Sequence, residues 1–138
     1  MIDYRTHIDK GSMFNTPPAF TIYVIGEVLK HIEKMGGLVE MEKRNIEKAD
    51  CLYNIFDSSE FFNGTVVPED RSLMNIPFRL PTEELEKKFI AEATAKNMIG
   101  LKGHRSVGGC RASVYNSQKL EATKALAKFM LEFEKNNK

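Results

Sequence analysis

The residues best suited to chemistry lie in one glycine-rich stretch, GLKGHRSVGGCRASVYN, which runs from Gly100 to Asn116. It places His104, Arg105 and Arg111 on a backbone that contains four glycines. A protonated imidazole beside a guanidinium suits a phosphate dianion, because both groups donate charge-assisted hydrogen bonds. A guanidinium held by a strand can bind a carboxylate through two parallel hydrogen bonds. We therefore hypothesise a small-anion site; the alternatives are a flexible surface loop and a structural ion pair made by Arg111.

The loop does not match known nucleotide-binding loops. A P-loop ends in Lys followed by Ser or Thr, whereas Gly108 is followed here by Gly109 and Cys110. The chain also contains no GxGxxG sequence. These differences favour a small anion over a nucleotide.

A second candidate anion site lies before the first predicted helix, at Asn15 and Thr16. Helix N-termini attract anions because their first amides lack hydrogen-bond partners. We expect Pro17 and Pro18 to fall in the first turn and to remove two of those donors. The side chains of Asn15 and Thr16, their own amides and the helix dipole would then hold a phosphate. The alternative is an ordinary helix cap.

Hydrophobic periodicity predicts two long helices in the first half of the chain. The first follows Pro18 and ends at Gly36, with apolar residues at Ile22, Ile25, Val28, Leu29 and Ile32. The second begins near Leu38, and its predicted stripe is Leu38, Met41, Asn45, Ala49, Leu52, Tyr53 and Phe56. The charged residues between Lys43 and Asp50 are expected on its solvated face.

From residue 64 the pattern changes to that of strands. Thr65–Val67 is predicted to be a short strand, and the alternation of Met74, Ile76, Phe78 and Leu80 predicts a strand with one buried face. Pro77 cannot donate to a sheet ladder, so we expect that strand to lie at an edge or to carry a bulge.

The last third of the chain is predicted to contain two helices and two strands. Thr82 should cap the first helix, whose stripe is Leu85, Phe89 and Ala93. Short strands are expected at 98–101 and 110–115, and a final helix buries Leu126, Phe129, Met130 and Phe133. Alternation in the second strand puts Cys110, Ala112 and Val114 on the core face. Arg111 then points away from the core.

The predicted order is α-α-β-β-α-β-β-α, which indicates the α+β class. Its simplest packing is a small, mostly antiparallel sheet covered by helices on one face and preceded by long helices. We expect two parts: residues 1–37, an irregular segment and a helix that would join another domain, and residues 38–138, the small α+β domain.

Composition narrows the function classes. The chain has 138 residues, 42% of them hydrophobic and 28% charged, with a net charge of +1. A balanced charge argues against nucleic-acid or anionic-membrane partners, and no apolar run approaches the roughly 20 residues of a membrane span. Cys51 and Cys110 match no metal-binding spacing, so we expect no metal site, and free thiols suit a cytoplasmic protein.

Four segments together resemble the phosphoserine aminotransferase family, PLP-dependent enzymes of the class V, type I fold. They are DYRTHIDKGSMFNTPPAFTIY, GGLVEMEKRNIEKADCLYNIFDSS, GTVVPEDRSLMNIPFRLP and GLKGHRSVGGCRASVYN. The resemblance covers essentially the whole chain, and the strings SMFNTPP and GLKGHRSVGG are its most specific parts. Since the matched segments end in the small domain, the chain resembles the C-terminal portion of the family.

The resemblance implies transfer of an amino group from glutamate to 3-phosphohydroxypyruvate, in serine and pyridoxine biosynthesis, with pyridoxal 5'-phosphate (PLP) as cofactor. It implies that Arg111 binds the substrate α-carboxylate and that His104 and Arg105 bind the substrate phosphate. Asn15 and Thr16 would reach the PLP phosphate of the partner subunit in a homodimer.

The resemblance also implies a part that this chain lacks. The lysine that forms the Schiff base with PLP belongs to the upstream domain of the family, and the chain offers no substitute, so no catalytic residue is assigned and the isolated chain is expected to be inactive. Two other hypotheses remain open: a stand-alone, non-catalytic module that binds a small phosphorylated carboxylic acid, and a structural or dimerisation fragment. In isolation we expect the first helix to expose its apolar stripe and to self-associate.

Overall fold

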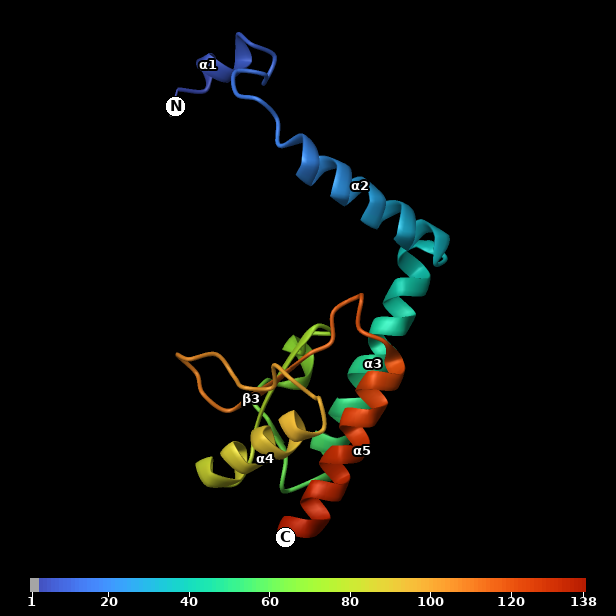
Figure 1. Cartoon of the computed structure of the whole chain (residues 1–138), viewed down its shortest axis with the longest axis vertical. Helices are drawn as coiled ribbons and strands as arrows, with labels where there is room; N and C mark the ends of the chain where they lie inside the picture. The colour runs from blue at the N-terminus through green and yellow to red at the C-terminus, as the bar shows by residue number, and fades with distance from the viewer. Residues whose placement is uncertain (1–2) are drawn as a thin grey trace. The chain divides into compact units, whose positions relative to one another are not determined.

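The computed structural model describes residues 3–138, which divide into two compact units (Figure 1). The first unit ends at Leu38, and the second comprises Val39–Lys138. That boundary falls at the glycine pair between the two predicted long helices. The role of the first part as a connection to another domain stays a prediction.

The first unit contains a short helix, α1 (Arg5–Ile8), and the predicted first long helix, α2 (Ala19–Lys34). The N-cap of α2 is Pro18, and no side chain caps this helix. The expectation of prolines inside the first turn was therefore wrong: both prolines precede the helix, and the amide of Ala19 donates to the carbonyl of Pro17 at 2.8 Å. Asn15 and Thr16 lie in irregular backbone before α2.

Helix α3 (Gly37–Ser58) confirms the predicted second helix; its first two residues belong to the first unit and the rest to the second. Most of its stripe is buried, but Leu38 is 78% exposed, because it lies in the first turn ahead of the core. Lys48 was expected on the solvated face and is instead 2% exposed. Its ammonium donates to the carbonyls of Val114 (3.1 Å) and Tyr115 (2.8 Å), which ties α3 to the chain that follows the last strand.

The sheet within residues 3–138 has three antiparallel strands in the order β1-β2-β3. The strands are β1 (Asn63–Gly64), β2 (Asn75–Arg79) and β3 (Cys110–Ser113). The first strand lies two residues before the predicted Thr65–Val67, because the chain turns there toward a 3₁₀ turn, η1 (Pro68–Asp70).

The strand that contains Pro77 is central, so the expectation of an edge position was wrong. Pro77 lies opposite Arg111 of β3, but its carbonyl accepts from the amide of Thr65 at 3.4 Å, on the β1 side. In an antiparallel strand the nitrogen and carbonyl of one residue face the same neighbour. The missing donor of Pro77 therefore faces the end of the short strand β1, and the β2–β3 ladder loses no hydrogen bond.

The predicted strand at 98–101 is reduced to a single bridge between Lys102 and Cys110. Asn97 (φ 63°) and Gly100 (φ 81°) adopt left-handed backbone, which prevents an extended run. The amide of Arg111 still donates to the carbonyl of Leu101 at 2.8 Å. Segment 101–103 is thus held along the outer edge of β3.

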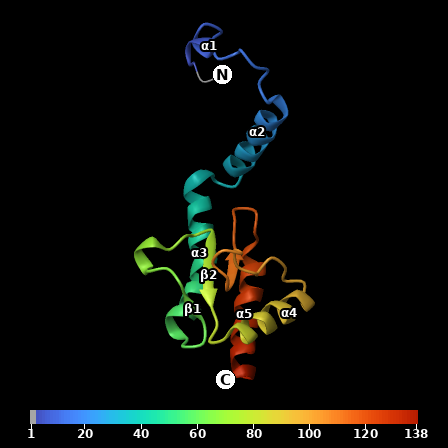
Figure 2. The same ribbon diagram turned by 90° about the vertical axis from the view of Figure 1, so that its left-hand side faces the viewer.

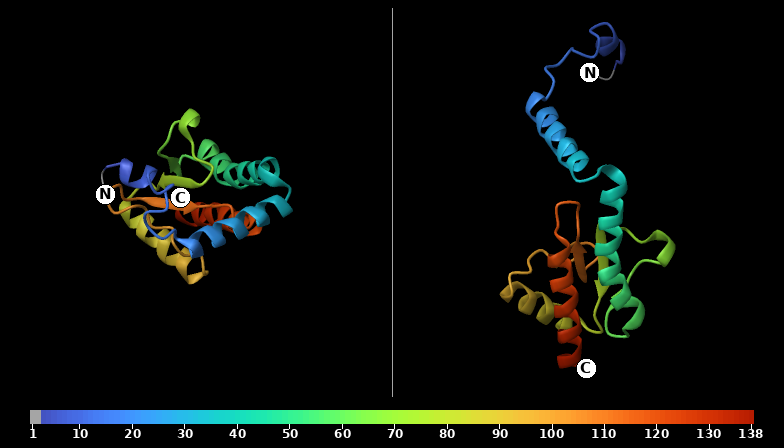
Figure 3. Two further views of the ribbon diagram at one scale, coloured as in Figure 1. Left: turned by 90° about the horizontal axis from the view of Figure 1, so that it is seen from above. Right: turned by 90° about the vertical axis from the view of Figure 1, so that its right-hand side faces the viewer.

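Two helices complete the unit, α4 (Glu83–Ala95) and α5 (Leu120–Asn137), and both were predicted. The hydroxyl of Thr82 accepts from the amide of Leu85, which confirms the predicted cap. Helices α3 and α5 lie side by side and run in the same direction (Figure 2 and the right-hand view of Figure 3). Lys124 is 3.5 Å from Glu47 near one end of the pair, and Ser59 donates to Glu134 at 2.9 Å near the other.

The core lies between one face of the sheet and helices α3, α4 and α5. The ring of Phe78 on β2 is 5.2 Å from Phe56 of α3 and 5.8 Å from Phe89 of α4. Phe89 in turn lies 5.1 Å from Phe129 and 5.2 Å from Phe133 of α5. The α+β class and the one-sided helical cover are as predicted; residues 3–138 contain one short helix more and one strand fewer than expected.

Across the described residues, 3–138, no helix combines the length and the apolar character that a membrane crossing requires.

Candidate anion-binding site

The glycine-rich loop between Lys102 and β3 is closed by its own backbone. Gly103 donates to the carbonyl of Gly109 at 2.9 Å. The amides of Val107 and Gly108 both donate to the carbonyl of His104, at 2.9 and 2.8 Å. These bonds form a tight turn that projects His104 and Arg105 from the edge of the sheet.

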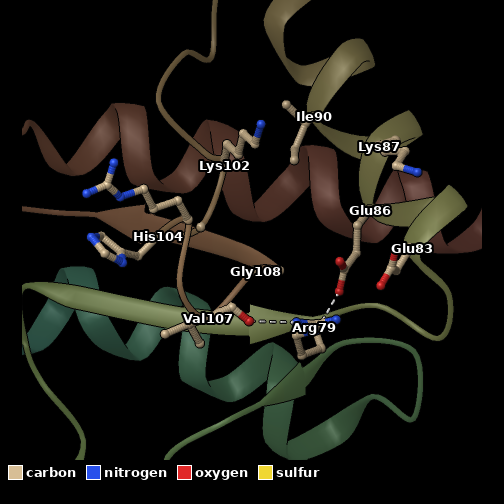
Figure 4. A pocket seen from close by; sticks show the side chains of 12 residues that line it. Arg79, Glu83, Glu86, Lys87, Ile90, Lys102, His104, Val107 and Gly108 are labelled. Atoms are coloured by element: carbon tan, nitrogen blue, oxygen red, sulfur yellow. Dashed lines mark hydrogen bonds and ion pairs between the residues drawn. The ribbon is translucent and has the colours of Figure 1, made fainter.

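This loop forms one wall of a cavity of about 550 Å³, and α4 with the end of β2 forms the other (Figure 4). The lining residues come from two stretches of the chain, 79–90 and 102–109. They are Arg79, Glu83, Glu86, Lys87, Ile90, Lys102, Gly103, His104, Arg105, Val107, Gly108 and Gly109. We call this cavity the loop pocket.

The loop pocket carries more positive than negative charge. Glu86 forms an ion pair with Arg79, 2.7 Å from its Nε, so those two charges cancel locally. Lys87, Lys102 and Arg105 then face only Glu83 as an opposite charge. Within the part of the chain that the structure describes, Arg105 has no carboxylate within ion-pair distance. An anion therefore has free cationic partners here.

The exposed ring of His104 is oriented by its neighbour Ser106. The ring Nδ1 lies 2.6 Å from the Ser106 hydroxyl oxygen and accepts from the Ser106 amide at 3.3 Å. Since Nδ1 is an acceptor in this arrangement, the tautomer that fits it carries its proton on Nε2. That N–H is the group free to donate to a ligand.

Arg111 points away from the core as predicted, but it does not line the loop pocket. The core-facing residues of its strand, Cys110, Ala112 and Val114, are buried, and Arg111 is half-buried on the opposite face. It lines a second cavity, of about 600 Å³, between the 96–101 segment and the beginning of α5. Its Nε is buried and has no partner among the described residues. The three predicted substrate-binding residues are thus divided between two cavities, His104 and Arg105 in the loop pocket and Arg111 in the second one.

Asn15 and Thr16 belong to the first unit, and both are exposed. The helix that follows them begins at Ala19, so the amides of Phe20 and Thr21 come next along the chain at its N-terminus. Exposed amide and hydroxyl side chains beside a helix N-terminus fit the chemistry of a phosphate group. The residues present are therefore compatible with the phosphate of PLP.

Sequence reasoning missed Arg79, Glu86 and Lys87 as parts of the loop pocket. The predicted helix cap at Thr82 could have indicated that the end of β2 and the first turns of α4 lie close together. The spacing alone does not reveal that the glycine-rich loop lies against both.

An α+β unit with a cationic loop at its sheet edge is consistent with many anion-binding proteins, and comparison with known families narrows the class. The Aminotransferase class-V family model matches residues 1–126. The chain belongs to this family.

Several curated relatives are named phosphoserine aminotransferase. The chain is 59% identical over 138 residues to the phosphoserine aminotransferase of Desulfatibacillum aliphaticivorans, and 54% identical over 138 residues to that of Lysinibacillus sphaericus strain C3-41. In both cases the match covers 99% of this chain and 38% of the relative. The chain thus spans well under half the length of the relatives it matches.

Solved structures with the same name also superimpose on this chain. The phosphoserine aminotransferase of Bacillus circulans subsp. alkalophilus superimposes with a TM-score of 0.90 and 46% identity, over 98% of this chain and 38% of that one. A PLP-bound phosphoserine aminotransferase from Trichomonas vaginalis gives a TM-score of 0.83 and 41% identity, over 94% of this chain and 37% of that one.

Proposed function

We propose that this chain is the substrate-anion-binding part of a phosphoserine aminotransferase, which converts 3-phosphohydroxypyruvate and glutamate to phosphoserine and 2-oxoglutarate. The observation that carries the proposal is the loop pocket, with free cationic side chains on a glycine-rich loop. Relatives with that name, at 54–59% identity over 138 residues, support the substrate assignment.

In this proposal His104 and Arg105 bind the substrate phosphate. The Nε2–H of the His104 ring and the guanidinium of Arg105 would both donate to the phosphate, and charge-assisted hydrogen bonds of this kind are stronger than neutral ones. The nearby ammonium groups of Lys87 and Lys102 add favourable potential for a dianion. A non-phosphorylated keto acid would leave these charges unpaired, so the pocket selects for the phosphate.

Arg111 binds the substrate α-carboxylate. A half-buried guanidinium that lacks an internal partner at Nε has unused donors in a fixed plane, and two of them match the two oxygens of a carboxylate. The strand holds this group in place, so the carboxylate would be bound in a fixed orientation. Glutamate, the other substrate, would present its own α-carboxylate to the same group.

Asn15 and Thr16 would hold the phosphate of PLP bound to the partner subunit of a cytoplasmic homodimer. When bound, PLP supplies an electron sink that stabilises negative charge on the substrate α-carbon. The lysine bonded to PLP is proposed to come from outside these 138 residues, as is the acid that pairs with its ring. The related phosphorylated keto acid of pyridoxine biosynthesis would satisfy the same phosphate and carboxylate contacts.

A hybrid enzyme tests the proposal. This chain would replace the matching segment of the Desulfatibacillum aliphaticivorans phosphoserine aminotransferase, to which it is 59% identical. We expect the hybrid to transaminate 3-phosphohydroxypyruvate with glutamate. Arg111→Ala should then reduce kcat/KM for both substrates by roughly a hundredfold, the loss of two charge-assisted hydrogen bonds.

Arg105→Ala in the same hybrid is the matched comparison, because it removes the same kind of side chain from the phosphate end only. We expect it to reduce kcat/KM for 3-phosphohydroxypyruvate and to leave that for glutamate nearly unchanged. An inactive hybrid that folds and binds PLP, or equal losses for both substrates in the Arg105 variant, would contradict the proposal.

A stand-alone, non-catalytic binding module is the second candidate. It is favoured by one observation: every residue that lines the loop pocket lies within the second unit, Val39–Lys138. Borohydride reduction of the chain with PLP, followed by mass spectrometry, tests the shared assumption of both candidates. We expect no dominant modified lysine, and stable modification of a single lysine would show that the PLP-bonding residue lies within this chain.

A further inference from the structure

The end of β2 is joined to α4 by a buried acid. The Oε1 of Glu86 lies 2.7 Å from the Nε of Arg79, and the Glu86 side chain is only 8% exposed while that of Arg79 is 38% exposed. The same oxygen accepts from the amide of Leu80 at 3.3 Å. Because a buried carboxylate is costly unless it is paired, Glu86 holds Arg79 in one orientation.

The other side of the Arg79 guanidinium reaches the glycine-rich loop. Its Nη1 donates to the carbonyl of Val107 at 3.2 Å, and Figure 4 shows this bond and the Glu86 contact meeting at one side chain. Arg79 therefore links a helix to the middle of the loop. A lysine could not make both contacts, since a single ammonium lacks the separated, coplanar donors of a guanidinium.

The aliphatic part of the Arg79 side chain also occupies the space that a side chain at position 109 would take. A Cβ atom added to Gly109 would lie 2.6 Å from the Cδ of Arg79 and 3.0 Å from the carbonyl oxygen of Phe78. A Cβ added to Gly108 would lie 3.1 Å from the Nη1 of Arg79. Both glycines have positive φ, 75° for Gly108 and 69° for Gly109, so the loop takes a shape that Arg79 contacts directly.

We propose that Arg79 and Glu86 are a positioning pair that fixes the glycine-rich loop, and with it the place of His104 and Arg105 at the edge of the loop pocket. The pair acts through the loop backbone and adds no net charge, because the carboxylate neutralises the guanidinium. Its effect on phosphate recognition rests on the proposed function; its effect on loop order does not.

Two readouts on the full chain test the proposal. Hydrogen exchange at the Gly103 and Gly108 amides reports loop order without a ligand, because both amides donate to carbonyls inside the loop. Calorimetric titration with phosphoserine reports the ligand site. The variants are Arg79→Lys, which keeps the charge and most of the stem, and Glu86→Gln, which keeps the shape. Glu92→Gln is the matched control, since Glu92 lies on the same helix and, among residues 3–138, its side chain forms an ion pair with Lys88 alone, at an exposed position.

We expect both variants to exchange the two loop amides on the order of tenfold faster and to bind phosphoserine roughly tenfold more weakly, the effect of losing one charge-assisted hydrogen bond. The Glu92 variant should match the wild type in both. If Glu86→Gln does not fold, Arg79→Lys carries the test alone. Wild-type exchange rates in Arg79→Lys would overturn the positioning role. Faster exchange together with no phosphoserine binding by the wild-type chain would support the positioning role and contradict the proposed function.

Discussion

Gly103→Ala is the perturbation that reports most sharply on how the loop is built. A Cβ atom at this position would overlap the carbonyl oxygen of Gly108, and it would lie 2.8 Å from the carbonyl oxygen of Gly109. Both are backbone atoms, so no rotamer change can relieve the overlap. The chain must separate at this point, which breaks the bond from the Gly103 amide to the Gly109 carbonyl, 2.9 Å long.

The expected cost follows from those two effects. Loss of one backbone hydrogen bond costs about 1 kcal/mol, and forcing extra volume into a closely packed place costs about 1–3 kcal/mol. Gly103→Ala should therefore lower the free energy of unfolding by about 2–4 kcal/mol. Urea unfolding followed by circular dichroism measures the difference, with an unchanged m-value as the sign that the unfolded state is unaffected.

Gly100→Ala is the matched control. Gly100 has φ 81°, but an added Cβ would meet nothing within 4 Å. This variant therefore carries only the strain of a left-handed alanine, about 1 kcal/mol. Equal losses of stability in the two variants would refute the reasoning, because they would mean that the close approach of Gly108 to Gly103 makes no contribution.

Four further predictions concern other parts of the chain. Cys110 is buried and its pKa is raised to about 12 by desolvation, from the usual 9.0, so an aromatic disulfide reagent should label Cys51 first and Cys110 only after unfolding. Because the folded state holds the Cys110 proton more tightly, stability should fall as the pH rises from 9 toward 12, and less so in Cys110→Ala. Lys48→Met should cost about 1–3 kcal/mol by leaving two carbonyls without their donor, whereas Lys43→Met on the exposed face should change stability by less than about 0.5 kcal/mol. No residue of α2, Ala19–Lys34, is buried, so sedimentation should show concentration-dependent self-association that Ile25→Glu weakens.

Local patterns in the sequence were enough to predict much of the fold. The stripe of α5 and the alternation of β3 depend on the 3.6-residue and 2-residue periods of a helix and a strand, and each period is visible within a few residues. Thr82 likewise indicated the beginning of α4, because a threonine hydroxyl is a typical helix N-cap. These features needed no knowledge of distant contacts.

The errors arose where the outcome depends on partners far along the chain. The central position of β2 depends on a first strand of two residues, Asn63–Gly64, too short to show a period. Lys48 is buried because two carbonyls beyond β3 accept from it, and a lysine on a helix gives no local sign of such partners.

The candidate site, too, could be predicted only in part from the sequence. The types and spacing of His104, Arg105 and Arg111 indicated anion binding, but not that Arg111 lies in a separate cavity. Residues 101–103 lie along the edge of β3, with a bridge between Lys102 and Cys110; Lys102 and Gly103 line the loop pocket, whereas Leu101 and Arg111 line the second cavity. The Arg79–Glu86 pair could not be predicted from the sequence either, because its proposed role depends on the glycine-rich loop that packs against Arg79.

Phosphate recognition by the glycine-rich loop is tested most directly by a phosphorus-NMR titration of phosphoserine with the wild-type chain and with Arg105→Ala. We expect a saturable change in the phosphoserine signal with the wild type, reversed by inorganic phosphate but not by serine, and a much weaker change with the variant. An equally strong change with Arg105→Ala, or reversal by serine, would show that the glycine-rich loop does not recognise the phosphate.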